Sequence, residues 1–151
     1  MTDHSDSVHP IPDDEFWQIY RRVPRLTVEL IVPTSEGILL TKRDIEPCRG
    51  IWHFPGGTVQ FGELVEEAGR RVAGRKLGIN PKKLEFLGYI EYPSHFQTGL
   101  DSPVGMAFRI DGFTGQLAPK IEVSEFGYFT RPPENMHAEQ IEFIKRFGNM
   151  G

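Results

Sequence analysis

The sequence predicts an α+β domain in which strands come first, one helix lies in the middle and another helix closes the chain. Residues 26–32 alternate between apolar and polar side chains, as a half-buried strand does. Residues 64–77 follow a glycine-rich turn and repeat apolar side chains with a helical period, and 138–147 do the same. This order of elements is typical of an α+β sandwich.

The first part of the chain reads as a helix followed by two strands. Residues 13–23 begin with acidic side chains and then carry several aromatic and aliphatic ones, which predicts a short helix. The strand 26–32 runs into the turn P-T-S-E-G and continues as a second strand over 38–43. A loop with proline and glycine follows at 44–50.

The second part alternates between the central helix and later strands. The apolar face of helix 64–77 consists of Leu64, Val65, Ala68, Val72 and Leu77. We expect strands at about 84–92, 104–111 and 126–130, and a final helix over 138–147.

Composition and charge exclude several classes of function. The chain has 151 residues and a net charge of -4, so nothing in its overall charge attracts nucleic acid or an anionic membrane. No stretch approaches the ~18 apolar residues of a membrane span. Residues 1–12 read as an acidic, flexible tail without a secretory signal. The single Cys48 excludes an internal disulfide, which suits a cytoplasmic protein, and without an evident histidine partner it is assigned no role.

One segment carries a recognisable motif. The pattern G-x5-E-x7-R-E-U-x-E-E-x-G-U, with U a bulky apolar residue, is met at Gly57, Glu63, Arg71, Gly78 and Ile79. The segment therefore resembles the signature box of the Nudix pyrophosphohydrolases. The box is degenerate, because Val72, Arg75 and Lys76 stand where the family has its three metal-binding glutamates.

The flanking sequence extends the resemblance over about residues 13–147. The aromatic-PGG lead-in at 52–57 and the strand at 37–43 are similar to the same family. Residues 23–32, with an acid at Glu29 and a helix before them, look like the GDP-mannose mannosyl hydrolase branch. The resemblance implies a Nudix-type α/β/α sandwich with a mixed β-sheet, a single domain over 13–151 and a homodimer formed through helix 13–23.

The usual metal site is expected to be weak or absent. Mg2+ prefers carboxylate oxygens, and residues 72, 75 and 76 are spaced to share one helix face. A dication about 5 Å from one positive charge is repelled by roughly 6 kcal/mol, more than a millimolar site supplies. The resemblance leaves the Gly56 carbonyl and Glu122 as ligands of a reduced magnesium shell.

Three residues are catalytic candidates. Glu63 would order the loop and the metal shell, or else act as an acid at the start of helix 64–77. Arg71 would brace the loop glutamates, as in the family, or form a surface pair with Glu67. Glu125 substitutes for the histidine base of the mannosyl branch, because Val123 holds that place in our alignment.

Substrate binding is predicted for cations near the glycine turn. By resemblance, Arg43 at a strand end reaches a diphosphate beside Gly57. Arg75 and Lys76 would capture phosphate in place of Mg2+. The alternative is that these cations only solvate a helix face.

Other positions are open to two interpretations. Glu29 either lines the pocket or faces solvent. Tyr92 either stacks on a base or packs in the core. His95 lies in a predicted loop, and His137 is expected to start the last helix.

Two functions fit the sequence. The first is a hydrolase of a nucleoside-diphosphate sugar, of GDP-mannose type, that works with a reduced metal shell. The second is an inactive Nudix-fold module that binds a nucleotide or sugar nucleotide in a regulatory or scaffolding role. The retained strand, Arg43 and the G-x5-E-x7-R spacing favour the first, and the lost glutamates favour the second.

Overall fold

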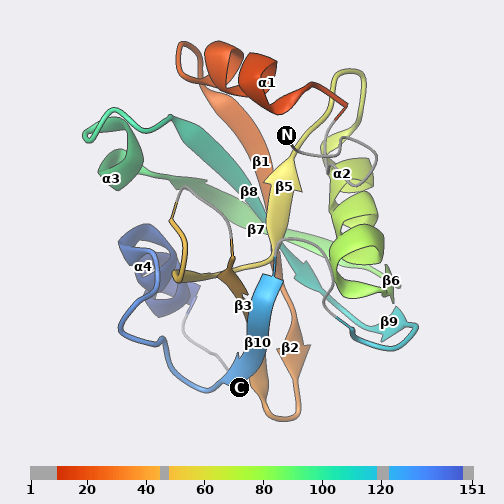
Figure 1. Cartoon of the computed structure of the whole chain (residues 1–151). Helices are drawn as coiled ribbons and strands as arrows, with labels where there is room; N and C mark the ends of the chain where they lie inside the picture. Colours follow the sequence, from red (N-terminus) through yellow and green to blue (C-terminus); the bar gives the residue numbers. More distant parts are fainter. Residues whose placement is uncertain (1–9, 45–47, 119–122, 148–151) are drawn as a thin grey trace.

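The strand β1 (Arg25–Ile31) organises a four-stranded mixed sheet in the computed structural model, which describes residues 10–44, 48–118 and 123–147. It pairs in parallel with β8 (Pro103–Ile110) and antiparallel with β5 (Gly56–Thr58). The fourth strand, β7 (Leu84–Glu91), is antiparallel to β8. Figure 1 shows helices on both sides of this sheet, which confirms the predicted α+β class with a mixed sheet.

Shorter strands complete the fold. The second sheet contains β10 (Val123–Phe129), β3 (Gly37–Arg43) and β2 (Pro33–Thr34), and β4 (Trp52–His53) also pairs with β3. A third, two-stranded sheet joins β6 (Asn80–Pro81) to β9 (Phe113–Thr114). Strands of two or three residues carry no alternation, so the sequence predicted none of β2, β4, β5, β6 and β9.

Within the described ranges, four α-helices surround the sheets. They are α1 (Asp13–Tyr20), α2 (Val65–Val72), α3 (Pro93–Phe96) and α4 (Ala138–Phe147). The helix predicted over 13–23 thus ends three residues early, and the predicted loop around His95 contains the short α3. Helix α2 packs on β1 and β5, and α4 packs on β7.

The helix predicted over 64–77 changes type in its last turn. Residues Ala73–Leu77 form a π-helix, which ends where Gly78 adopts a left-handed conformation. In the wider π turn, Lys76 stays on the buried face with Val72, while Arg75 is exposed. The expectation that all three box positions share one face is therefore wrong for Arg75.

The pleat of β1 separates two apolar clusters. Val28 and Leu30 point into the cluster beneath α2, and Ile31 points into a second cluster that α4 closes. Because side chains alternate along a strand, Thr27 and Glu29 face away from α2. The polar side chains Thr27 and Glu29 of β1 therefore enter the interior on the side away from α2.

Two predictions concern parts of the chain that the structure leaves out. The proposed metal ligand Glu122 and residues 1–9 of the predicted tail lie outside the described residues. Among the described residues, none of the helices combines the length and apolar character needed to cross a membrane.

The glycine turn generates a stability prediction. A Cβ at Gly56 would lie 2.4 Å from the backbone oxygen of Val28, whereas a Cβ at Gly57 would meet only the Cγ2 of Val72, at 3.0 Å. Gly56→Ala should therefore lower the free energy of unfolding by about 2–3 kcal/mol, and Gly57→Ala by less. Urea denaturation of both variants provides the measurement, and equal losses would contradict the assigned β5–β1 contact.

Candidate functional site

An ion pair fastens the glycine-rich turn to helix α2. Arg71 Nε donates to Glu63 Oε2 at 2.7 Å, and Arg71 Nη2 donates to Glu63 Oε1 at 3.1 Å and to the Thr58 carbonyl at 2.9 Å. Glu63 also accepts the Gln60 N–H at 3.0 Å. The helix begins after Leu64 without a side-chain cap. Glu63 therefore orders the loop and does not cap the helix, and Arg71 braces it.

Lys76 brings a positive charge to the turn. Its side chain is buried, and its ammonium group donates a hydrogen bond to the Gly56 carbonyl. That carbonyl oxygen was expected to ligate a metal ion. Val72, Arg75 and Lys76 offer no carboxylate, so the residues at the box do not fit Mg2+.

Glu29 lies beside the same turn. It is paired with Gly56 across the β1–β5 ladder, and its carboxylate and methylene groups fill the space that side chains at Gly56 and Gly105 would occupy. Only 8% of Glu29 is exposed, so the interpretation that it faces solvent is wrong. Thr27 Oγ1 and the Tyr92 hydroxyl donate to its Oε1 at 3.1 and 3.2 Å.

The buried environment changes the pKa of Glu29. Burial raises the pKa of Glu29 to about 7, although hydrogen bonds from Thr27 and Tyr92 and the charges of Arg25 and Lys76 oppose the rise. A carboxyl group with a pKa near the ambient pH is suited to general acid–base catalysis. The region thus contains the fixed positive charge of Lys76 and a carboxyl group, that of Glu29, that can exchange a proton near neutral pH.

Tyr92 is part of the interior. The residue is 3% exposed, so its ring is not accessible for stacking on a base, and core packing is the interpretation that the structure shows. Its hydroxyl accepts a hydrogen bond from Gln140 Nε2 at 3.0 Å. Gln140 Oε1 in turn accepts the Phe54 N–H at 2.9 Å, so α4 holds the tyrosine that holds Glu29.

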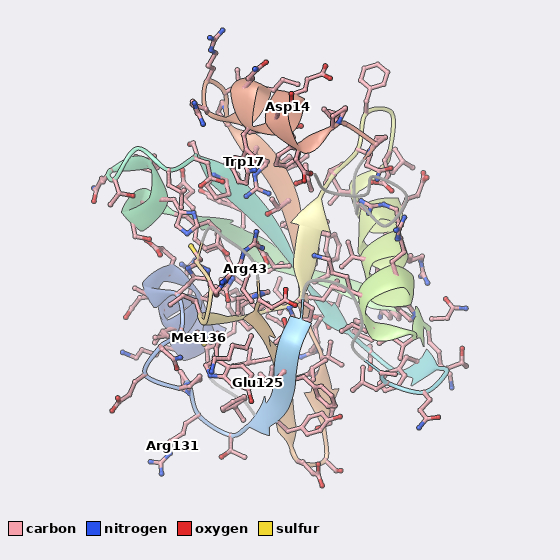
Figure 2. All side chains as sticks on the ribbon, viewed as in Figure 1. Asp14, Trp17, Arg43, Glu125, Arg131 and Met136 are labelled. Carbon is pink, nitrogen blue, oxygen red and sulfur yellow. The ribbon has the colours of Figure 1, made fainter. Side chains whose placement is uncertain are left out.

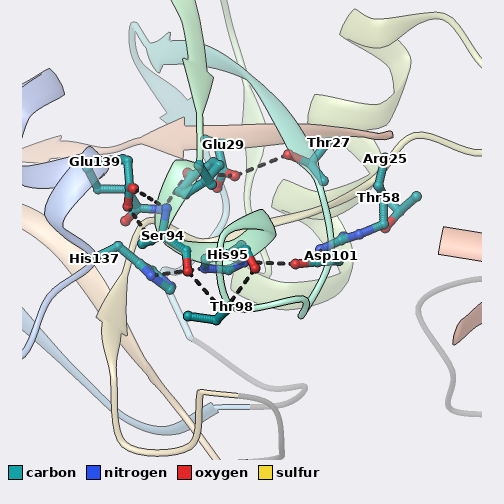
Figure 3. A network of polar contacts seen from close by, with 12 residues as sticks. Arg25, Thr27, Glu29, Thr58, Ser94, His95, Thr98, Asp101, His137 and Glu139 are labelled. Carbon is teal, nitrogen blue, oxygen red and sulfur yellow. Dashed lines mark hydrogen bonds and ion pairs between the residues drawn. The ribbon is translucent and has the colours of Figure 1, made fainter. Parts of the chain in front are cut away.

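A second polar group extends from β1 to α3 and α4 (Figure 3). Arg25 donates to Thr58 Oγ1 at 2.9 Å and to Asp101 Oδ2 at 2.8 Å. Asp101 Oδ1 lies 2.9 Å from His95 Nδ1, and His95 Nε2 lies 3.4 Å from His137 Nδ1. The sequence missed this network because its members come from separate segments without a shared spacing.

His53 and His137 are neutral at physiological pH. Burial lowers the pKa of His53 to about 3 and that of His137 to about 4. The charge of Arg43, at the end of β3, contributes to both shifts. The carbonyl of His137 accepts the N–H groups of Gln140 and Ile141, which confirms its expected place at the start of α4.

The role of Glu125 as a base stays a prediction. It lies exposed on β10 (Figure 2), where it accepts a hydrogen bond from Lys42 Nζ at 2.9 Å. Glu125 thus forms a surface ion pair with Lys42 on the neighbouring strand β3. The prediction came from an alignment across the loop before β10.

Comparison with known proteins gives consistent results. A family model described as the NUDIX domain matches residues 23–147. The low-salt glycan biosynthesis protein Agl8 of Haloferax volcanii is 35% identical over 131 residues, which cover 84% of each protein. The ADP-ribose pyrophosphatase of Methanocaldococcus jannaschii is 32% identical over 106 residues, which cover 70% of this chain and 62% of that protein. A MutT NUDIX hydrolase from Burkholderia pseudomallei has a similar crystal structure, with a TM-score of 0.70, 26% identity and coverage of 80% of this chain and 95% of the other.

The Glu63–Arg71 pair predicts a pH-dependent contribution to stability. The hydrogen bond from Arg71 is the main reason that the pKa of Glu63 lies below its usual 4.5, so the stabilisation is present above that pH and is lost as the pH falls through the lower folded-state value. Glu63→Gln should reduce the free energy of unfolding by about 1.5–3 kcal/mol at neutral pH and by less in acid. Urea denaturation across pH tests this, with the exposed Glu67→Gln as the matched control. A loss independent of pH would contradict the assigned pairing.

Glu29 predicts the opposite pH dependence. The unfolded carboxyl releases its proton near 4.5 and the folded one near 7, so the wild-type protein loses stability as the pH rises between these values. The side chain of Glu29→Gln cannot ionise. The free energy of unfolding of this variant, relative to that of the wild type, should therefore rise by about 3 kcal/mol between pH about 4 and pH about 8. Chemical denaturation at several pH values measures the difference, with Glu125→Gln as a control for the loss of one carboxylate. A difference that does not change with pH would show that the pKa of Glu29 is not raised in the folded protein.

Proposed function

Because the chain belongs to the NUDIX domain family, we propose that it hydrolyses a nucleoside-diphosphate sugar, of GDP-mannose type, without magnesium at the usual box position. Two relatives support this substrate class. One is named for glycan biosynthesis, and the other for cleaving ADP-ribose, which is itself a nucleoside-diphosphate sugar. The finer choice of GDP and mannose rests on the resemblance of residues 23–32.

The hydrogen bond from Lys76 to the Gly56 carbonyl carries the proposal. A buried ammonium group at this point supplies fixed positive charge where diphosphate oxygens need it. Arg43 is the second cation proposed to contact the diphosphate, and the backbone of Gly57 allows close approach. Arg75 is exposed on the outside of the helix and is assigned at most a weak, peripheral contribution.

Glu29 supplies the other half of the chemistry. In the proposed step, the oxygen of a water molecule forms a bond to the anomeric carbon of the sugar, the bond from that carbon to the diphosphate oxygen breaks, and the Glu29 carboxylate takes up the proton of the water. Lys76 and Arg43 stabilise the negative charge that remains on the leaving diphosphate. Glu63 and Arg71 act indirectly, because they hold the turn that positions Gly56.

A binding module without catalysis is the second candidate. The same Lys76–Gly56 hydrogen bond favours it, because an ammonium group cannot activate water as a dication does. In that case the site would hold a sugar nucleotide for a regulatory or scaffolding role. Turnover decides between the two candidates, since both require the same ligand contacts.

The homodimer through residues 13–23 stays a prediction. Part of the apolar face of α1 serves the chain itself, because Phe16 is buried, packs against Trp17 and Tyr20 and lies under the guanidinium of Arg25. Ile19 is 37% exposed, so its side chain is accessible for contact with a partner subunit. Sedimentation of the full chain measures the association.

Two neighbouring cations provide a matched test of the binding site. Lys76→Met removes the buried charge and Arg75→Met the exposed one, with similar changes in side-chain volume. Lys76→Met should weaken GDP-mannose binding about ten- to a hundredfold, as should Arg43→Ala, while Arg75→Met changes it little. Calorimetry measures the affinities, and thermal unfolding confirms that each variant is folded.

The same titrations test the metal requirement. Binding should be equal with and without millimolar Mg2+, and phosphorus NMR should show whether GDP-mannose is consumed. Consumption supports the hydrolase, and binding without consumption supports the module. Binding of GDP-mannose that requires Mg2+ and is unaffected by Lys76→Met would refute the role of Lys76 in both candidate functions.

A further inference from the structure

We propose that Cys48, His95 and His137 form a binding site for a transition metal ion of the zinc class. One donor atom from each of the three side chains lies within 4.8 Å of the other two. The ligands come from the loop before β4, from α3 and from the residue that precedes α4. The sequence assigned no role to Cys48 because nothing in its spacing reveals the two histidines.

The two imidazoles are already spaced for a metal. His95 Nε2 and His137 Nδ1 lie 3.4 Å apart, and two nitrogens each about 2.0–2.1 Å from a tetrahedral zinc ion are separated by about that distance. Because the sulfur of Cys48 lies within 4.8 Å of both nitrogens, it needs to move inward by at most about 1 Å to reach a Zn–S distance of about 2.3 Å. A loop side chain can make such a movement without a change in the sheets.

Asp101 orients one of the ligands. When His95 Nδ1–H donates to Asp101 Oδ1, at 2.9 Å, the lone pair of Nε2 faces His137. The Asp101 side chain is only 2% exposed and is held by Arg25, which is itself anchored on Thr58. Figure 3 shows His95 between Asp101 and His137. A buried carboxylate behind a histidine is the usual outer support of a metal-bound imidazole.

The donor set selects the metal. A thiolate with two imidazoles suits zinc and its neighbours and does not suit Mg2+. The positive charge of Arg43 near His137 opposes any cation, but the Cys48 thiolate and Asp101 carry two negative charges that offset it. Three protein ligands leave a fourth coordination position for water or another small ligand.

The site adjoins Glu29 without sharing its ligands. The Tyr92 ring lies 5.3 Å from the His95 ring and 5.9 Å from the His137 ring, and its hydroxyl reaches Glu29. The inference goes beyond the proposed function and does not depend on it, because neither Lys76 nor Gly56 is a ligand.

Cobalt substitution provides the test. Metal-free, untagged protein titrated with Co2+ should bind one equivalent, with a thiolate-to-cobalt charge-transfer band and the intense visible bands of tetrahedral cobalt, and Zn2+ should displace it. Cys48→Ser should abolish the charge-transfer band, and His137→Ala should weaken Zn2+ binding at least tenfold. Asp101→Asn should keep the band and weaken affinity about ten- to a hundredfold, as a positioning residue does.

Two further measurements separate this site from others. His4→Ala/His9→Ala removes the two histidines nearest the N-terminus and should leave the titration unchanged. Zn2+ should raise the thermal unfolding temperature of the wild type but not that of Cys48→Ser. A charge-transfer band that is absent at one equivalent, or that survives in Cys48→Ser, would overturn the proposal. Neither result would alter the effect of Lys76→Met on GDP-mannose binding.

Discussion

The hydrogen bond between the Lys76 ammonium and the Gly56 carbonyl brings a buried positive charge to the glycine-rich turn. It links the end of the central helix to the strand β5, and β5 is bound to β1 directly opposite Glu29. In a protein interior, a fixed charge acts over a short distance with little screening. The positions of the turn, the strand and the buried acid therefore all enter the electrostatics of one small region.

Glu29 shows how this region is balanced. Burial alone would keep the carboxyl protonated, whereas Lys76, Arg25 and two hydroxyl donors favour its anion. The result is a group that changes charge near neutrality, and such groups gather at functional sites. Tyr92 and Gln140 extend this balance to α4, so the last helix of the chain also supports the first strand.

The sequence predicted the parts of the fold that have a strong local period. The five long strands, the helix α4, and α2 taken together with its π turn all lie within about three residues of their predicted bounds, because alternation and helical repeats are visible in one segment. The Glu63–Arg71 contact was also predictable, since both residues belong to one motif. The base role of Glu125 stays a prediction, because it depends on the alignment of a loop. The His95–Asp101–His137 group was missed because it forms only when the segment between β7 and β8 meets the start of α4.

The π-helical turn Ala73–Leu77 sets how many charges face the glycine turn. In an α-helix, residues three and four positions after Val72 flank the same side of the cylinder, and both cations would border the site. The wider winding leaves Lys76 in place and turns Arg75 out to solvent. The central helix therefore contributes one positive charge to the glycine turn and not two. Backbone winding, and not residue identity alone, thus decides how much charge the helix brings to the buried carboxylate of Glu29.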